Sequence, residues 1–272
     1  MADNLIFLDK EFSKRLERTE ARANADFVEA RVRLEPESDA AWIDIAGTYA
    51  MYDGSDSPLT QTFGLGLFTD DFEKVLDQAE EFFKKRDAPV FHEVSPLADA
   101  SLLGVLCDRG YRPIEWTNVM FRELAGYSQI VDARFKIRIV DADEGDLWAK
   151  TAAAGWATEF EGIEEFMYGI GRVSANAGGT MPFLAELEGR PVGTGALAIY
   201  DDACLLAGAS TVPAARRQGA QTALLAARLN FAREQGCSLA MMGASPGSQS
   251  QKNAQKNGFS IAYTRIKWQL LG

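Results

Sequence analysis

The sequence predicts an α+β protein of two tandem domains, and three observations lead to this prediction. At 272 residues, the chain has the length of two domains of about 130 residues each. Short apolar runs of strand character alternate with amphipathic segments of helical period along the whole chain. Both halves also close with the same order of elements: a strand, a short helix, a glycine–aromatic pair and a last strand.

This internal repeat also sets the expected domain boundary. The matching segments are 90–96 and 239–246, then 109–111 and 257–259. We therefore expect one domain to be used twice, over residues 1–130 and 131–272, with the boundary inside 127–133. Two unrelated α+β pieces are the alternative.

The first half is expected to begin with a long helix over 7–30, where Phe12, Leu16 and Phe27 lie among charged neighbours. An aromatic-rich strand at 41–50 and a polar turn rich in Gly and Pro follow. The remaining elements expected here are a helix over 71–85, a strand over 89–94, a helix over 97–107 and a strand over 111–124.

The second half has the same rhythm. The elements expected are strand 137–140, helices 143–156 and 161–173, strands 181–188, 191–200 and 203–212, helix 217–235, strand 237–242, helix 248–257 and strand 259–270. The apolar face of helix 217–235 carries Ala220, Leu224, Ala227 and Phe231, and Gly236 stands where a C-cap glycine ends a helix.

Charge, cysteine and hydropathy patterns exclude several classes of function. The net charge of −11 argues against nucleic-acid binding, and it suits cationic partners such as amines, although solubility explains it equally well. Cys107, Cys204 and Cys237 are widely spaced and His92 is the only histidine, so neither a metal site nor a Cys–His nucleophile is expected. The chain shows neither a basic leader segment nor a long apolar span. We expect a cytoplasmic protein without a membrane partner, of undetermined oligomeric state.

An anion-binding site is predicted where the strand 203–212 runs through a proline turn into the helix 217–235. The first backbone N–H groups of a helix have no internal partner, and the helix dipole adds positive charge there. Gly219 leaves room for a close approach, Arg216 and Arg217 raise the positive potential, and the Thr222 hydroxyl offers a further donor. Taken alone, the pattern also fits a helix start with two solvated arginines.

Residues Arg216 to Gln221 resemble the Gln/Arg-x-x-Gly-x-Gly/Ala signature of the GNAT (general N-acetyltransferase) superfamily, and the resemblance extends over 136–272. It implies a three-layer α/β fold with a mixed, mostly antiparallel twisted sheet flanked by helices in each domain. It also implies that acetyl-CoA is the cosubstrate. The backbone of Ser210, Thr211 and Val212 would bind pantetheine. The diphosphate would be held by Arg217, Gln218, Gly219, Ala220, Gln221 and Thr222.

The sequence departs from the family pattern at three positions. Gln221 replaces the second small residue of the signature, and its amide N–H stays available if the side chain points away. Ala254 stands where a tyrosine often acts as general acid, and Gly247 replaces an asparagine common at the start of that helix.

The first half has the outline of the domain without its anion site. The corresponding loop, 63–71, has no arginine and ends in Asp70 and Asp71, which would repel a polyanion. Its glycines also lack the third member of a dinucleotide fingerprint. We expect a degenerate copy that does not bind CoA.

The resemblance implies direct transfer of the acetyl group to a primary amine in a ternary complex. A backbone N–H at the end of strand 203–212 is expected to polarise the carbonyl. A carboxylate must accept the proton of the amine, and Glu161 is the candidate among Glu159, Glu161, Glu164 and Glu165, which also fit a solvated helix face. Ser250 and Tyr263 are candidates to protonate the thiolate. Cys204 and Cys237 are expected to be core residues.

The sequence leaves the acceptor open, whether a small-molecule or a peptide amine. The loss of the tyrosine at Ala254 supports an alternative function, a non-catalytic acyl-CoA-binding regulatory module. A P-loop nucleotide site is excluded, because Gly219 is not followed by Lys and Ser or Thr.

Overall fold

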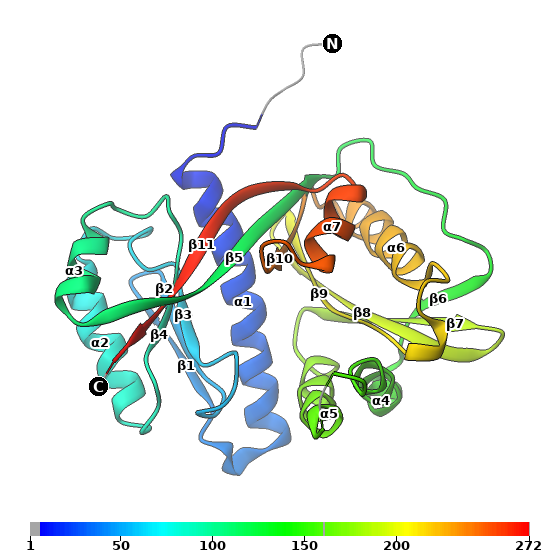
Figure 1. Ribbon diagram of the computed structural model, residues 1–272, viewed down its shortest axis with the longest axis horizontal. Helices are drawn as coiled ribbons and strands as arrows, with labels where there is room; N and C mark the ends of the chain where they lie inside the picture. The colour runs from blue at the N-terminus through cyan, green and yellow to red at the C-terminus, as the bar shows by residue number, and fades with distance from the viewer. Residues whose placement is uncertain (1–5, 160, 272) are drawn as a thin grey trace. The chain divides into compact units, whose positions relative to one another are not determined.

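The chain forms two compact units in the computed structural model, which describes residues 6–159 and 161–271 (Figure 1). The first five residues, part of the segment considered above for a leader, lie outside these ranges. Unit 1 comprises Met1–Val28, Glu35–Arg122 and Gly243–Gly272, and unit 2 comprises Glu29–Leu34 and Glu123–Met242. These units do not coincide with the expected cut after residue 130.

The C-terminal segment belongs to unit 1 because of strand pairing. Strand β11 (Ser260–Leu270) pairs antiparallel with β5 (Tyr111–Glu123) along almost its whole length and with β4 (Phe91–Val94) on its other side. A strand held by ladders on both edges cannot leave its sheet without losing both sets of backbone hydrogen bonds.

Unit 1 contains a six-stranded sheet in the order β1-β2-β3-β4-β11-β5, in which only β3 and β4 are parallel. Its other elements are most of α1 (Lys10–Leu34), η1 (Pro36–Ser38), β1 (Ala41–Ile45), β2 (Thr48–Tyr52), β3 (Gln61–Phe63), α2 (Phe72–Lys84), α3 (Leu102–Asp108) and α7 (Gln249–Lys256). Helix α1 begins at Lys10, later than expected, because the Asp9 Oδ1 accepts the Phe12 N–H at 2.8 Å.

The single strand expected over 41–50 is wrong, because the chain forms a hairpin there. Strands β1 and β2 pair antiparallel around Ala46 and Gly47, whose φ values are 50° and 94°. Positive φ at both positions is the mark of a tight two-residue hairpin turn, which Ala seldom adopts. The Asp44 Oδ1 stabilises the turn by accepting the Gly47 N–H at 2.7 Å.

Helices cover both faces of this sheet. On one face, Ala21, Ala25 and Val28 of α1 pack against Met51 and Phe63. On the other, α2 and α3 bury an apolar cluster against the strands that includes Phe72, Leu76, Phe83, Leu102, Leu106 and Trp268. Unit 1 is therefore a three-layer sandwich.

Unit 2 contains a five-stranded sheet in the order β10-β9-β8-β7-β6, in which only β9 and β10 are parallel. Its elements are β6 (Phe135–Ile139), η2 (Ala142–Glu144), α4 (Gly145–Ala154), α5 (Ile163–Ser174), β7 (Thr180–Leu187), β8 (Arg190–Tyr200), β9 (Ala203–Thr211), η3 (Pro213–Ala215), α6 (Ala220–Glu234) and the start of β10 (Leu239–Ala244).

Unit 2 is also three-layered, since neighbouring residues of β7 point to opposite faces. Leu184 packs on one face against Trp148 and Ala152 of α4, while the Phe183 ring meets Phe231 of α6 edge to face. The predicted fold class, with mixed and mostly antiparallel sheets flanked by helices, is confirmed. No helix within the described ranges is long and apolar enough to cross a membrane.

Candidate functional site

The site predicted from the sequence lies where β9 parts from β10 in unit 2. The parallel pairing joins Ala203–Leu205 to Leu239–Met241, and between the described residues of the two strands it stops there. Strand β9 continues to Thr211, and Ala207, Gly208 and Ala209 are exposed. A strand that loses its neighbour presents backbone donors and acceptors to a ligand.

The exposed part of β9 contains a bulge. The register with β8 shifts between Thr194 and Ala196, so that extra chain in β9 opposes these residues. Gly208 takes a φ of 60°, and a Cβ there would lie 3.1 Å from the Trp148 ring. Glycine at 208 thus satisfies both the left-handed backbone and the tight packing over Trp148.

The loop that leads from β9 into α6 forms an anion cradle. Arg217 and Gly219 both have positive φ values, 63° and 101°, and Gly219 is the N-cap of α6. Alternating left-handed residues turn successive N–H groups to one side, and the helix start adds its unpaired N–H groups and dipole. No side chain caps α6, and its first turn carries no acidic residue. This end of the helix is suited to bind a diphosphate.

The two arginines of the loop have different positions. The Arg216 guanidinium donates to the carbonyl oxygens of Gly155, at 2.7 Å, and Thr211, at 3.4 Å, so it ties the loop to the end of α4. Arg217 is exposed, and its side chain makes no hydrogen bond or ion pair with another described residue. Arg217 is therefore the arginine free to meet a phosphate.

Gln221 turns its side chain back onto the sheet. Its Nε2 donates to the carbonyl oxygens of Ser210 (2.6 Å) and Thr194 (3.3 Å) and to the Thr211 Oγ1 (2.9 Å). The side chain that departs from the family signature thus points away from the start of α6 and fastens the helix to the end of β9.

The three residues expected to bind pantetheine differ in what they offer. The Val212 N–H already donates to the Val192 carbonyl at 3.0 Å, so this donor is not free. Because backbone groups alternate in direction along a strand, Thr211 faces the opposite edge of β9. Ser210 is buried, and its hydroxyl donates to the Ala152 carbonyl at 2.7 Å. Thr211 is therefore the best placed of the three.

The sequence around this site matches a known protein family. A model of the acetyltransferase (GNAT) family matches residues 146–259, which include the bulge, the loop and α6. Residues 146–259 are thus similar to GNAT acetyltransferases, and we call this matched stretch the GNAT domain. No curated protein matches the sequence.

Solved structures that resemble the whole chain show the same fold. A GCN5-related N-acetyltransferase from Kribbella flavida superposes with a TM-score of 0.62 at 18% identity, covering 93% of this chain and 95% of that one. A tandem GNAT protein from the clavulanic acid biosynthesis pathway covers 98% of both chains, with a TM-score of 0.57 at 13% identity. The fold of this chain thus resembles that of a tandem GNAT protein over almost its whole length.

The candidates for proton transfer lie in both units. Glu161 is exposed just before α5 in unit 2, and Ser250 is exposed on α7 in unit 1. Tyr263 lies on β11, beyond the matched GNAT domain, and only 7% of its surface is exposed. Ala254, where the family pattern expects a tyrosine, is buried in α7.

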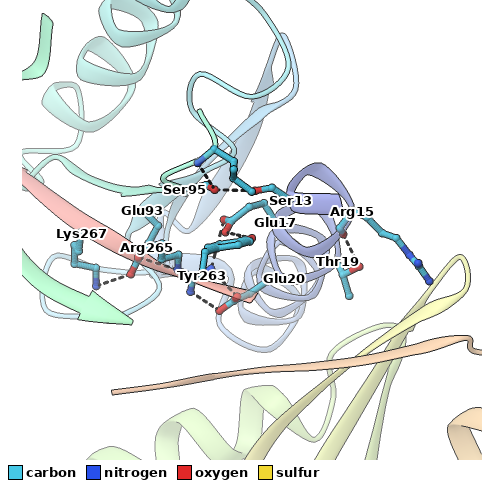
Figure 2. A network of polar contacts seen from close by, with 11 residues as sticks. Ser13, Arg15, Glu17, Thr19, Glu20, Glu93, Ser95, Tyr263, Arg265 and Lys267 are labelled. Atoms are coloured by element: carbon cyan, nitrogen blue, oxygen red, sulfur yellow. Dashed lines mark hydrogen bonds and ion pairs between the residues drawn. The ribbon is translucent and has the colours of Figure 1, made fainter. Parts of the chain in front are cut away.

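Tyr263 belongs to a buried polar network in unit 1 (Figure 2). Its hydroxyl donates to the Glu17 Oε1 at 2.9 Å, and Arg265 binds Glu20 at 2.7 Å and Glu93 at 2.9 Å. Burial raises the pKa of Tyr263 well above its usual value. A hydroxyl that is enclosed and committed to Glu17 is poorly suited to protonate a thiolate, so this placement disagrees with the role considered for Tyr263.

In unit 1, the counterpart of the anion loop is filled by its own side chains. Leu65 and Leu67 are almost fully buried, and a Cβ on Gly66 would lie 2.8 Å from Leu102. The Thr62 Oγ1 and the His92 Nδ1, 2.7 Å apart, join the paired strands β3 and β4 by a side-chain hydrogen bond. The loop is packed as part of the core.

A buried arginine in the GNAT domain was not identified from the sequence. Arg228 lies on the buried side of α6, and 3% of its surface is exposed. The sequence contains a signal for it, since Arg228 stands one turn after Leu224 and shares its face of the helix.

Proposed function

We propose that the GNAT domain binds acetyl-CoA at the β9–α6 junction and transfers the acetyl group directly to a primary amine in a ternary complex. The observation that carries this proposal is the cradle formed by Arg217 and Gly219 at the uncapped, acid-free start of α6, beside the open edge of β9. In this arrangement the diphosphate lies on the helix start and the pantetheine arm runs along β9 past Thr211.

The chemical roles follow from what the reaction needs. An exposed amide of the β9 bulge polarises the thioester carbonyl, Glu161 accepts the proton of the ammonium group, directly or through water, and Ser250 is the remaining candidate to protonate the thiolate. A small-molecule or peptide amine is the acceptor. The first GNAT-like domain is proposed to be a degenerate copy that does not bind CoA, which its packed loop and the pair Asp70 and Asp71 support.

Calorimetric titration with acetyl-CoA tests the cofactor site. Gly219→Glu places a carboxylate at the helix start. A Cβ there has no neighbour closer than 3.7 Å, so the structural cost is the backbone strain at a φ of 101°. We expect the variant to bind at least about tenfold more weakly, since it adds like charge next to the diphosphate. Loss of micromolar affinity only in this variant would support the site, and no binding by the parent would refute it.

Gly236→Glu is the matched control. Gly236 ends the same helix, its φ is 89°, and a Cβ there has no neighbour within 4 Å. Both substitutions therefore introduce the same side chain at a glycine of positive φ, at opposite ends of α6. Equal losses in the two variants would point to backbone strain instead of charge at the diphosphate.

A second candidate function is a non-catalytic acyl-CoA-binding module, which the buried Ala254 and the enclosed Tyr263 favour. Release of CoA in the presence of a library of primary amines distinguishes the binding module from the transferase. Turnover that falls with Glu161→Gln supports the transferase. Tight acetyl-CoA binding without turnover of any amine supports the binding module.

A further inference from the structure

Arg228 is a buried cation without a carboxylate partner in the described part of the chain. Its guanidinium lies against Gly195 of β8, where a Cβ would come within 2.6 Å of the Arg228 Cζ. Burial lowers the pKa of Arg228 to about 10, so the side chain keeps its charge at neutral pH. A buried charge is costly unless it is compensated by hydrogen bonds. The Arg228 guanidinium donates to the backbone carbonyl oxygens of Leu224, Ala196 and Ala207.

Two of these carbonyls flank the bulge of β9. The Arg228 Nη1 donates to the Ala196 oxygen at 3.0 Å and to the Ala207 oxygen at 3.2 Å. Ala196 and Ala207 face each other across the strands, directly before the register shifts. Arg228 thus holds both strands at the point where the ladder becomes irregular.

The next carbonyls of β9 are held by side chains as well. The Thr194 hydroxyl, which is fully buried, donates to the Gly208 oxygen at 3.1 Å, and Gln221 donates to the Ser210 oxygen at 2.6 Å. Side chains from α6 and β8 therefore replace the ladder partners that the bulge removes. The orientation of these peptide planes is fixed by three side chains.

The directions of these carbonyls fix the directions of the backbone N–H groups that follow them in β9. In a planar trans peptide, the N–H of a residue points opposite to the carbonyl of the residue before it. Because the Ala207 carbonyl points to Arg228, the Gly208 N–H points away from Arg228. Because the Gly208 carbonyl points to Thr194, the Ala209 N–H points away from Thr194. Gly208 and Ala209 are both exposed.

We infer that Arg228 is a positioning residue which, together with Thr194, turns the amides of Gly208 and Ala209 toward the open edge of β9, where they polarise the thioester carbonyl of acetyl-CoA. This inference rests on the proposed function. Arg228 touches neither cosubstrate. It acts through the Ala207–Gly208 peptide, and its delocalised, rigid guanidinium is suited to bridge two carbonyls.

The experiment uses the full chain and acetyl-CoA labelled with carbon-13 at the thioester carbonyl. A hydrogen bond to that oxygen displaces the carbonyl resonance of the bound ligand from its free position. We expect a displacement in the parent, its loss in Arg228→Met, and partial retention in Arg228→Lys, whose ammonium still offers donors to the two carbonyls. CoA itself has no thioester. Its dissociation constant should therefore differ by less than about twofold among the parent, Arg228→Met and Arg228→Lys.

Leu229→Ala is the control for stability alone. Leu229 neighbours Arg228 in α6 and is fully buried, so its truncation destabilises the helix packing without touching the bulge. It should lower the melting temperature and keep the carbonyl displacement. If Arg228→Met does not fold, Thr194→Val removes the donor to Gly208 at nearly constant shape, and the displacement should decrease.

The outcomes separate this inference from the proposal on which it rests. A parent that does not bind acetyl-CoA refutes the proposed function, and the inference falls with it. A parent that binds acetyl-CoA without displacing the carbonyl resonance overturns the inference alone. Full displacement in Arg228→Met, or in both Arg228→Lys and Thr194→Val, overturns it as well.

Discussion

Gly155 joins the end of α4 to β9 so closely that the substitution Gly155→Ala tests the architecture of the site. A Cβ at this position would lie 1.8 Å from the Ser210 Oγ, 3.1 Å from the Ser210 Cβ and 2.9 Å from the Thr211 nitrogen. The φ of Gly155 is −70°, which alanine adopts without strain. Steric exclusion is therefore the main destabilising contribution.

The expected loss in the free energy of unfolding follows from the displacement of β9 and α4. Rotation of the Ser210 hydroxyl does not relieve the contact with the Thr211 nitrogen, so β9 and α4 must separate. Overpacking of this kind costs about 1–3 kcal/mol. Separation also breaks the bond from Ser210 to the Ala152 carbonyl, which is worth about 1 kcal/mol. We expect a loss of about 2–4 kcal/mol in the free energy of unfolding, or about 4–16 °C in melting temperature for a chain of this size.

Urea unfolding and calorimetry of five proteins measure this loss: the parent, Gly155→Ala, Ser210→Ala, the double variant of these two, and a control. Gly169→Ala is the matched control, because Gly169 lies inside α5 with no neighbour within 4 Å of a Cβ, and alanine there should stabilise the helix by about 1 kcal/mol. The double variant Gly155→Ala/Ser210→Ala removes the atom that clashes most and should recover at least about 1 kcal/mol relative to additivity.

Two results would refute this reasoning. Unchanged stability of Gly155→Ala would show that a Cβ at residue 155 fits between α4 and β9 without displacing either. A purely additive double variant would show that the cost arises away from Ser210.

Two further predictions concern buried titratable groups of unit 1. Burial raises the pKa of Glu17 from 4.5 to about 7, so its stabilising contribution is complete below about pH 4.5 and is lost as the pH rises through 7. In urea titrations, the free energy of unfolding of Glu17→Gln should therefore rise by about 2–4 kcal/mol relative to that of the parent between about pH 5 and pH 8. A difference between the two proteins that does not vary with pH would contradict this. Burial lowers the pKa of His92 to about 3, so the ring resonances of this single histidine should not titrate between about pH 5 and pH 8; a sigmoidal shift near its ordinary pKa of 6.5 would show that the His92 ring is solvated.

The anion cradle is the part of the site that the sequence predicts best. Positive φ at Gly219, the uncapped start of α6 and the exposure of Arg217 all depend on residues within one turn of each other. Short-range backbone geometry of this kind is visible in a local pattern, and so is the absence of arginine in the matching loop of the first half.

The sequence was less informative wherever a residue's role depends on a distant neighbour. Arg216 was expected to raise the potential at the loop, yet it binds the Gly155 carbonyl. Tyr263 was a candidate acid, yet its hydroxyl is bound to Glu17, 246 positions away in the chain. The hairpin at Ala46 was not predicted, because alanine seldom adopts the left-handed conformation that this turn requires.

The sequence by itself determined the α+β fold class, the internal repeat and the place of the loop before α6, because hydrophobic period, turn residues and helix starts act over a few positions along the chain. Only the tertiary structure decided that β11 belongs to unit 1, that Gly66 is packed against Leu102, and that Arg228 holds the β9 bulge. Each of these depends on strand pairing or burial between segments far apart in the sequence, and such contacts are not encoded in any local pattern.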